Sequence, residues 1–505
     1  MTALAIGSPS TDEAVAIGSG KPRPRAAWMT VALAVVAMLV VGLRGLNRGS
    51  MWRDESATFD ASQRGLGQLL AMLGHVDAVH GAYYLLMHFW MELGSGEVWM
   101  RVPSVLAMAV AAGLVAALGA RLLRPRVGLA AGLLFAVTPW VSFYAQEGRS
   151  YAMVTAAALL ATYSLVRAVE AVDHRRWWAA YAAAAVSSAL LHEFAVLLLL
   201  AHAVTLLLSR VARQVWVRWA AAAGVCCVVL APLAFFSQGQ SEQVSWLKRP
   251  GWEAVWGLVR SFAGPVVGVV AVVLVLAVAG AVPQSGRVEQ AGRLRLSAVA
   301  VPLAVLPPAV LLLASQIQPM YHERYVLFSL AGVPLLAAAG LERIGALLPG
   351  AAVPWVLGGA AVAAVLVVQL PEQQAERTVT SRADDLAGAA QAVRVGARPG
   401  DGVVFLTPNY RAVKLVYPVA FRGVDDVALQ KSPVRAANLR GDERSLRRTR
   451  LAILAKDRVW LVGKKSLRAG DNRGAKNKKD TLLDSFRAVT TVHVHGVDVR
   501  LYVKN

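Results

Sequence analysis

The chain has 505 residues, of which 56% are hydrophobic and only 16% are charged, and its mean hydropathy is +0.50. These values differ from those of an average soluble domain and predict a polytopic membrane protein. The formal net charge of +21 does not indicate a nucleic-acid partner. Basic clusters fall in every second connection between apolar runs, as the positive-inside rule predicts for cytoplasmic loops.

Residues 1–26 are rich in Gly, Ser, Pro and Ala, and they predict a disordered tail. The tail ends in the basic residues Lys21, Arg23 and Arg25, so we expect the N-terminus in the cytoplasm. The apolar run that follows lacks a clear small-residue cleavage site, which predicts a retained membrane anchor.

Residues 27–370 are expected to form a transmembrane domain. Apolar runs long enough to cross roughly 30 Å of hydrocarbon recur throughout this stretch and predict about eleven helices. They centre near residues 27–46, 101–122, 127–145, 150–168, 177–191, 194–208, 217–236, 263–283, 297–316, 325–341 and 351–370. An odd number of spans places everything after residue 370 outside the cell, opposite the N-terminus.

The first external loop, residues 47–99, is too long for a passive connection. Two of its segments, "QRGLGQLLAMLG" and "GAYYLLMHFWMEL", have helical apolar periodicity. We expect both segments to form amphipathic helices that lie on the membrane surface.

Residues 371–505 predict an extracytoplasmic α/β domain, because an amphipathic helical pattern is followed by strand patterns at "GDGVVFL" and "RVWLVGKK". A final hairpin is predicted to turn at His495 and Gly496, and residues 466–480 are expected to form a loop. The domain has 26 Lys and Arg against 14 Asp and Glu, which suits either an anionic surface or simple solvation.

Asp54 and Glu55 stand side by side at the start of the first external loop, in "MWRDESATFD". Two interpretations are open: a solvated pair at the membrane surface, or a catalytic group. In the second, an aspartate deprotonates an acceptor hydroxyl while a lipid-linked donor stays in the bilayer. Because adjacent side chains point in different directions, we favour Asp54 as the base.

His75, Asp77 and His80 have a spacing that can bind a divalent metal ion, although no third strong ligand is assured. The alternative is that His80 contacts substrate or caps the following helix.

Polar residues also gather at later external connections. "YAQEGRSYA" contributes Gln146, Glu147, Arg149 and Tyr151, which either pair with one another or line the cavity of Asp54. His192, in "LLHEF", marks either the tip of a helical hairpin or an active cavity.

Arg324 and Tyr325, in "QPMYHERYVLF", begin a late apolar run. An arginine fork at the level of the lipid head groups suits a phosphate, either of a substrate or of ordinary lipid.

The order of these segments resembles the integral-membrane glycosyltransferases of the C superfamily. The resemblance covers about residues 27–345 and rests on "RDES", "VHGAYYLLMHFWMEL", "TPWVSFYAQEGRSYAM", "LLHEF" and "HERYVLFSLAGVPLLAAAGL". It is strongest to the branch that contains protein O-mannosyltransferases and the bacterial aminoarabinose transferase of lipid A. The C-terminal domain departs from the β-trefoil of eukaryotic protein mannosyltransferases, which leaves a protein acceptor in question.

This resemblance implies transfer of a sugar, mannose or a related one, from a polyprenyl-phosphate donor to an acceptor hydroxyl, with inversion. It implies that Asp54 acts as the base, with Glu55 as a second acidic residue. Residues implied to bind donor or substrate are His80, Glu147 (or Gln146), Arg149, Tyr151, His192, Arg324 and Tyr325.

No cofactor is required by this interpretation, and a divalent metal ion stays an alternative. The expected partners are the lipid-linked donor, membrane lipids, and a glycan, lipid or protein acceptor of the cell envelope, with no nucleic acid. Two other functions are open: an envelope-lipid transporter or flippase, and a non-catalytic glycolipid-binding protein. Transporters tend to show inverted repeats, whereas here the polar residues gather on one outer face, which favours an enzyme.

Overall fold

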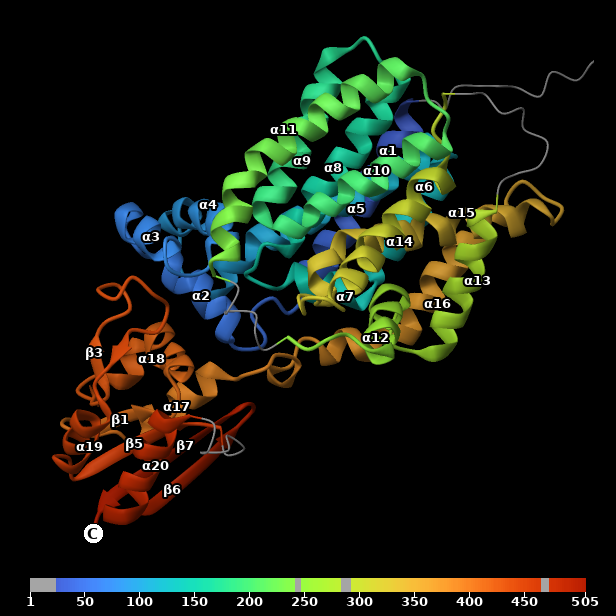
Figure 1. The fold of residues 1–505 in the computed structure, drawn as a ribbon. Helices are drawn as coiled ribbons and strands as arrows, with labels where there is room; N and C mark the ends of the chain where they lie inside the picture. Colours follow the sequence, from blue (N-terminus) through green and yellow to red (C-terminus); the bar gives the residue numbers. More distant parts are fainter. Residues whose placement is uncertain (1–23, 241–246, 283–291, 465–471) are drawn as a thin grey trace, which may run out of the picture.

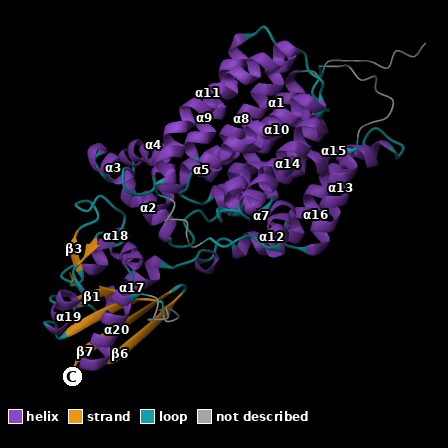
Figure 2. Cartoon of the chain, in the orientation of Figure 1, coloured by secondary structure: helices purple, strands orange, loops and turns teal. Residues whose placement is uncertain are grey.

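The computed structural model describes residues 24–240, 247–282, 292–464 and 472–505. Figure 1 shows a long bundle of helices and, at the C-terminal end, a smaller part that contains the strands. Figure 2 separates the two by secondary structure. Most of the tail predicted over residues 1–26 lies outside the described residues, and the first helix, α1, spans Pro24–Leu43.

The bundle follows the apolar runs of the sequence, because a helix satisfies its backbone hydrogen bonds internally and can therefore cross a bilayer. Every predicted run overlaps at least one helix. After α1 the bundle contains α5 (Glu97–Leu122), α6 (Pro125–Val137), α7 (Pro139–Ala145), α8 (Tyr151–Glu170), α9 (Arg175–Leu191), η2 (Glu193–Val196), α10 (Leu197–Leu208), α11 (Arg213–Gln238), α12 (Trp252–Ala263), α13 (Val267–Ala281), α14 (Leu296–Ala314), η4 (Glu323–Ala331), α15 (Gly332–Ala346) and α16 (Val353–Ala375).

Six helices among the described residues are long and apolar enough to cross a membrane, or up to eight if each bent pair is one span. The bent pairs are α6 with α7, at 66°, and α12 with α13, at 79°. Pro139 and Pro265 stand at these two breaks, where proline cannot continue the preceding helix. The other predicted spans fall on α1, α9 and α10, which this criterion does not count as full spans.

Small residues let neighbouring helices approach closely. A Cβ added to Gly128 of α6 would lie 2.2 Å from the carbonyl oxygen of Ala116 in α5. Because lipid offers no hydrophobic driving force between helices, such close packing holds a membrane bundle together. We therefore expect any side chain at position 128 to separate α5 from α6.

The long loop of residues 47–99 is folded into helices: α2 (Arg53–Ser62), α3 (Leu66–Leu73), η1 (Ala78–His80) and α4 (Gly81–Glu92). The two predicted helices are thereby confirmed as α3 and α4, whereas their position on a membrane surface stays a prediction. Their inner faces share a buried cluster with Met51, through Leu69, Met72, Tyr83, Tyr84 and Met87. Their outer faces leave large apolar side chains exposed, among them Leu70, Leu86, Phe89 and Leu93.

The C-terminal part is a mixed sheet with helices on both faces. Its strands are β2 (Asp425–Asp426), β1 (Gly402–Phe405), β5 (Arg458–Gly463), β7 (Val497–Lys504) and β6 (Phe486–Val494), in that spatial order. β1 pairs in parallel with β2 and β5, whereas β7 is antiparallel to β5 and β6. A separate two-stranded ribbon joins β3 (Leu429–Lys431) to β4 (Asp442–Glu443).

Alternate residues of the strands pack into two hydrophobic cores, one on each face of the sheet. Val403 and Phe405 of β1 pack with α17 (Leu386–Gly396), and Val404 packs on the side of α19 (Leu446–Leu454) and α20 (Arg473–Ser485). Such alternation is the period of a strand that is buried on both faces. The sequence therefore folds here as an α/β unit, as predicted.

Two details of this part test the sequence analysis. The predicted hairpin is confirmed: it turns at His495 and Gly496, and Gly496 adopts a φ of 73°, which glycine tolerates best. The loop predicted over residues 466–480 is wrong from residue 473, where α20 begins. Asn472 caps this helix by accepting a hydrogen bond from the amide of Ala475, and the preceding residues 465–471 lie outside the described part.

Candidate active site

Helix α2 brings the two adjacent carboxylates of the sequence to different places. Glu55 is fully buried and receives two hydrogen bonds from the guanidinium of Arg101, at 2.8 and 2.7 Å. It also accepts one from the backbone amide of Gly148, at 2.8 Å. Burial raises the pKa of Glu55, but the charge and hydrogen bonds of Arg101, the charge of Arg382 and the hydrogen bond from Gly148 together outweigh burial and hold this pKa below its usual value. Glu55 therefore locks α2 to α5 and to the loop before α8, and does not face solvent.

Asp54 instead forms an ion pair with Arg324, with 2.9 Å between Oδ2 and Nη1. The Asp54 side chain is 31% exposed, whereas that of Arg324 is 11% exposed. The structure thus joins the loop of residues 47–99 to the start of η4. An accessible carboxylate beside a held cation can take up a proton from a bound hydroxyl group.

Arg149 connects several residues that the sequence singled out. Its guanidinium donates to Nε2 of His80 at 2.7 Å and to the hydroxyl of Tyr84 at 3.1 Å. It also donates to the backbone carbonyl of Asp54 at 3.3 Å. Tyr84 in turn donates to Asp77 at 2.7 Å. Arg149 therefore ties α2, η1 and α4 together beside the Asp54 carboxylate.

Aromatic rings surround the guanidinium of Arg324. It lies 5.5 Å from the ring centre of Tyr151 and 5.7 Å from that of Tyr325. His192 packs on Tyr325 with 4.6 Å between ring centres. Its burial, followed by the charges of Arg324 and Arg149, lowers the pKa of His192 to about 3. These four side chains form one wall, in which the histidine is neutral at physiological pH.

Glu147 and Gln146 occupy separate environments. Gln146 donates to the carbonyl oxygens of Gly42 and Arg44, at 2.8 and 2.9 Å, and so anchors the end of α1. Glu147 is 1% exposed, and its nearest cation is Arg382, at 3.6 Å. Burial outweighs the charge of Arg382 and raises the pKa of Glu147. Gln146 is therefore occupied by backbone contacts, whereas neither carboxylate oxygen of Glu147 accepts a hydrogen bond among the described residues.

Several polar atoms around this wall are buried without a hydrogen-bond partner among the described residues. They are Nδ1 of His80, Nδ1 of His192, Nε of Arg149, Nε of Arg324 and both carboxylate oxygens of Glu147. Buried polar groups without partners cost free energy, so they are rare unless they serve binding or catalysis. Their gathering here marks the place as a site for a polar ligand.

The described residues contain no group of three His, Cys, Asp or Glu side chains that could hold a metal ion. The candidate His75, Asp77 and His80 side chains have other partners. Nδ1 of His75 lies 2.8 Å from the carbonyl oxygen of Ala71, Asp77 accepts from Tyr84, and His80 accepts from Arg149. These contacts favour the alternative in which His80 contacts substrate.

The α/β part contributes to the site, a role that the sequence analysis did not assign. Asp384 is 2% exposed and accepts from Arg53, the neighbour of Asp54, at 2.6 Å. Arg382 stacks on Phe143 with its guanidinium carbon 3.5 Å from the ring centre. Tyr417 bonds to Glu97 of α5, next to the buried cluster of α3 and α4. The helix that carries Asp54 is thus held from both parts of the molecule.

Arg101, Tyr84 and Arg382 are the other site residues that sequence reasoning missed. Arg101 stands at the head of an apolar run, in "WMRVPSVL", where an interfacial arginine is ordinary. Its position one turn inside a helix was the signal that it needs a partner, but nothing local names Glu55 as that partner.

Fold and site together define a multi-pass membrane protein in which a cluster of buried polar groups contains a partly exposed carboxylate, Asp54. Residues 81–236 match the family described as dolichyl-phosphate-mannose-protein mannosyltransferase. This match confirms the class of enzyme that the sequence predicts, a membrane glycosyltransferase of the C superfamily. No curated protein sequence matches the chain.

Solved structures share the fold. ArnT from Cupriavidus metallidurans in the apo state is 14% identical, with a TM-score of 0.59, and the likeness covers 94% of this chain and 98% of that one. The same protein bound to undecaprenyl phosphate is 13% identical, with a TM-score of 0.56 and coverage of 94% and 97%. The likeness therefore extends over the helical bundle and the C-terminal part alike.

Proposed function

We propose that the protein transfers a sugar, mannose or a related hexose or pentose, from a polyprenyl-phosphate donor to a hydroxyl group of a cell-envelope acceptor. The observation that carries this proposal is the accessible Asp54 carboxylate, paired with Arg324 inside a cluster of buried, unpartnered donors. The mannosyltransferase family match and the undecaprenyl phosphate bound to ArnT support the donor class.

The proposed reaction is a single displacement at the anomeric carbon. The acceptor oxygen forms a bond to that carbon, the bond from carbon to phosphate oxygen breaks, and the configuration inverts. Asp54 takes the proton of the acceptor hydroxyl as it attacks. Arg324 stabilises the negative charge that grows on the departing polyprenyl phosphate, because a fixed guanidinium in a dry site needs no reorganisation.

His80 is suited to bind the sugar or the phosphate as a neutral donor. Burial lowers the pKa of His80 well below its ordinary value, and the charges of Arg149 and Arg324 lower it further. Arginine can only donate, so Nε2 of His80 accepts from Arg149 and the ring proton resides on Nδ1. This Nδ1 atom is buried without a partner among the described residues, which leaves it available to a ligand oxygen.

The proposed topology has about eleven spans, with the N-terminus in the cytoplasm and the α/β part outside. Both ends of α5 support it: Arg101 lies beside the site, and Arg121 belongs to the basic cluster with Arg124 and Arg126. Twenty residues of helix separate the two ends by about 30 Å. On the site side, the exposed apolar faces of α3 and α4 suit the membrane surface.

The test of function uses purified wild-type protein, radiolabelled polyprenyl-phosphate mannose, and lipid and glycan fractions of the envelope as acceptors. Wild type is expected to transfer label, whereas Asp54→Asn is not. Glu92→Gln, which changes a carboxylate that is 62% exposed on α4, is the matched control and keeps full activity. Transfer by Asp54→Asn at the wild-type rate would refute the assigned base.

Topology is tested with a phosphatase reporter fused after Thr380, beyond the end of α16 at Ala375. We expect activity only when the fusion point lies outside the cell. Activity of a cytoplasmic reporter at the same position would refute the proposed orientation.

A further inference from the structure

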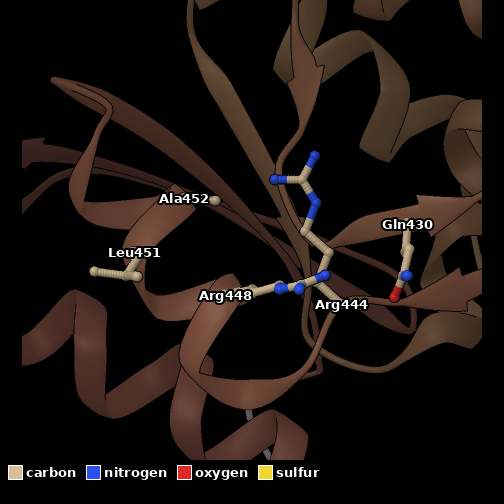
Figure 3. A pocket seen from close by; sticks show the side chains of 5 residues that line it. All are labelled: Gln430, Arg444, Arg448, Leu451 and Ala452. Carbon is tan, nitrogen blue, oxygen red and sulfur yellow. The ribbon is translucent and has the colours of Figure 1, made fainter.

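The α/β part has a hollow of about 530 Å³ between its two-stranded ribbon and helix α19. Gln430 lines it from β3, and Arg444 lines it from the residue after β4. Arg448, Leu451 and Ala452 line it from α19. Figure 3 shows both arginine side chains lying between Gln430 on one side and Leu451 and Ala452 on the other.

Two elements bring the arginines together. Arg448, Leu451 and Ala452 recur at helical spacing on α19, so their side chains share a face, whereas Arg447 and Arg450 of the same helix do not line the hollow. Arg444 precedes the helix, between β4 and the cap residue Ser445. Ser445 caps α19 by accepting from the amide of Arg448 at 3.4 Å. Arg444 donates from Nε to the carbonyl oxygen of Leu429 at 3.2 Å, which orients its guanidinium.

These two arginines differ from the paired cations that lie near them in this part. Arg411 pairs with Asp426 and Glu443, and Lys478 pairs with Glu443 as well. Within the described residues, Arg444 and Arg448 have no ion pair, and no acidic side chain lines the hollow. Glu443, the residue before Arg444 in the sequence, is already shared by Arg411 and Lys478. Two unpaired guanidinium groups in one hollow suit a phosphate or a carboxylate, which they can bind in a bidentate way.

We propose that this hollow binds an anionic saccharide, held through its phosphate or carboxylate group, and that it recruits the acceptor for the transfer reaction. The second half of the proposal rests on the proposed function. A saccharide fits because Leu451, 58% exposed, and Ala452 offer an apolar wall to a sugar ring, while the amide of Gln430 can bond a hydroxyl. A flat anionic membrane would need no hollow.

Binding is tested first, on the full-length protein in detergent, with mannose 6-phosphate as the probe and unphosphorylated mannose as its neutral counterpart. Calorimetry at low salt should show binding of the phosphorylated sugar that weakens as salt is raised. The double variant Arg444→Gln, Arg448→Gln should bind it at least tenfold more weakly. Arg447→Gln on the same helix, which is exposed and outside the hollow, should bind as wild type does. Equal binding by all three proteins would overturn the proposal.

Two further measurements distinguish a sugar phosphate from a lipid head group as the bound anion, and test whether the hollow recruits the acceptor. If the double variant lost binding only to phosphatidylglycerol vesicles and not to the sugar phosphate, the hollow would be a lipid contact and the proposal would fail. In the transfer assay, the double variant should raise KM for an anionic acceptor with kcat unchanged. Asp54→Asn should lose transfer but keep sugar-phosphate binding. Binding without any transfer by wild type would refute the proposed function and the recruiting role, but not the anion site.

Discussion

The adjacent carboxylates Asp54 and Glu55 point to different sides of helix α2, and their surroundings differ. On the inner side, Glu55 is completely buried and each of its oxygens is held by Arg101. On the opposite side, one carboxylate oxygen of Asp54 pairs with Arg324, and the side chain keeps partial access to solvent. The inner pair fixes the backbone that presents the outer one. Of these two adjacent carboxylates, one is thus locked into the structure, and the other is accessible enough for the catalytic role that we propose for it.

The largest expected effect is the loss of activity on changing Asp54. Asp54→Asn removes the proton acceptor while keeping the shape of the side chain, so kcat should fall by about 10² to 10⁴. The midpoint of thermal unfolding should change little, because a partly exposed ion pair contributes only about 1 kcal/mol. Transfer assays and thermal unfolding of the same preparation check this. A variant that loses activity only in proportion to lost folded protein would contradict a catalytic role.

Glu55→Gln tests the inner side. The change leaves the Arg101 guanidinium buried without its counter-charge, and breaking a buried pair in this way costs about 3–5 kcal/mol of folding free energy. We expect a large drop in the unfolding temperature, measured in detergent by intrinsic fluorescence. Activity per folded molecule should fall far less than in Asp54→Asn. A stable but inactive Glu55→Gln protein would reverse the roles given to the two carboxylates.

Much of the architecture could be predicted, because apolar runs, positive clusters and the His495–Gly496 turn are local signals. Helix α2 could not: "RDESATFDAS" has no clear apolar period, and its helix depends on distant partners such as Arg101 and Asp384. Asp54 was identifiable because a carboxylate beside an apolar run is unusual. Its neighbours were identifiable by residue type, but their pairing was not, since Arg324 lies 270 residues away.

A third carboxylate, Glu376, extends the comparison, because it is partly buried and has a hydroxyl, Ser142, as its hydrogen-bond donor at 2.9 Å instead of an arginine. Burial therefore raises the pKa of Glu376 to about 8. Between the unfolded pKa, near 4.5, and about 8, the folded state holds the extra proton, so this group makes stability fall as pH rises. Glu376→Gln removes the penalty. The variant should unfold at a higher temperature than wild type at pH 9 and at the same temperature at pH 4; a difference of equal size at both pH values would contradict a buried, proton-holding carboxyl.

The smallest expected effect concerns Arg53, which extends from the start of α2 to Asp384 in the α/β part. The Arg53 side chain is 38% exposed, so solvent screens the pair, and a double-mutant cycle with Arg53→Gln and Asp384→Asn should give a coupling of about 0.5–1 kcal/mol. The same cycle run on kcat separates two roles of the contact. If the pair positions the Asp54 backbone, both single variants should lower kcat by a common factor, and the double variant should lower it no further. Independent, multiplying losses would show instead that the α/β part only rests against α2, leaving the position of Asp54 to the inner pair of Glu55 and Arg101.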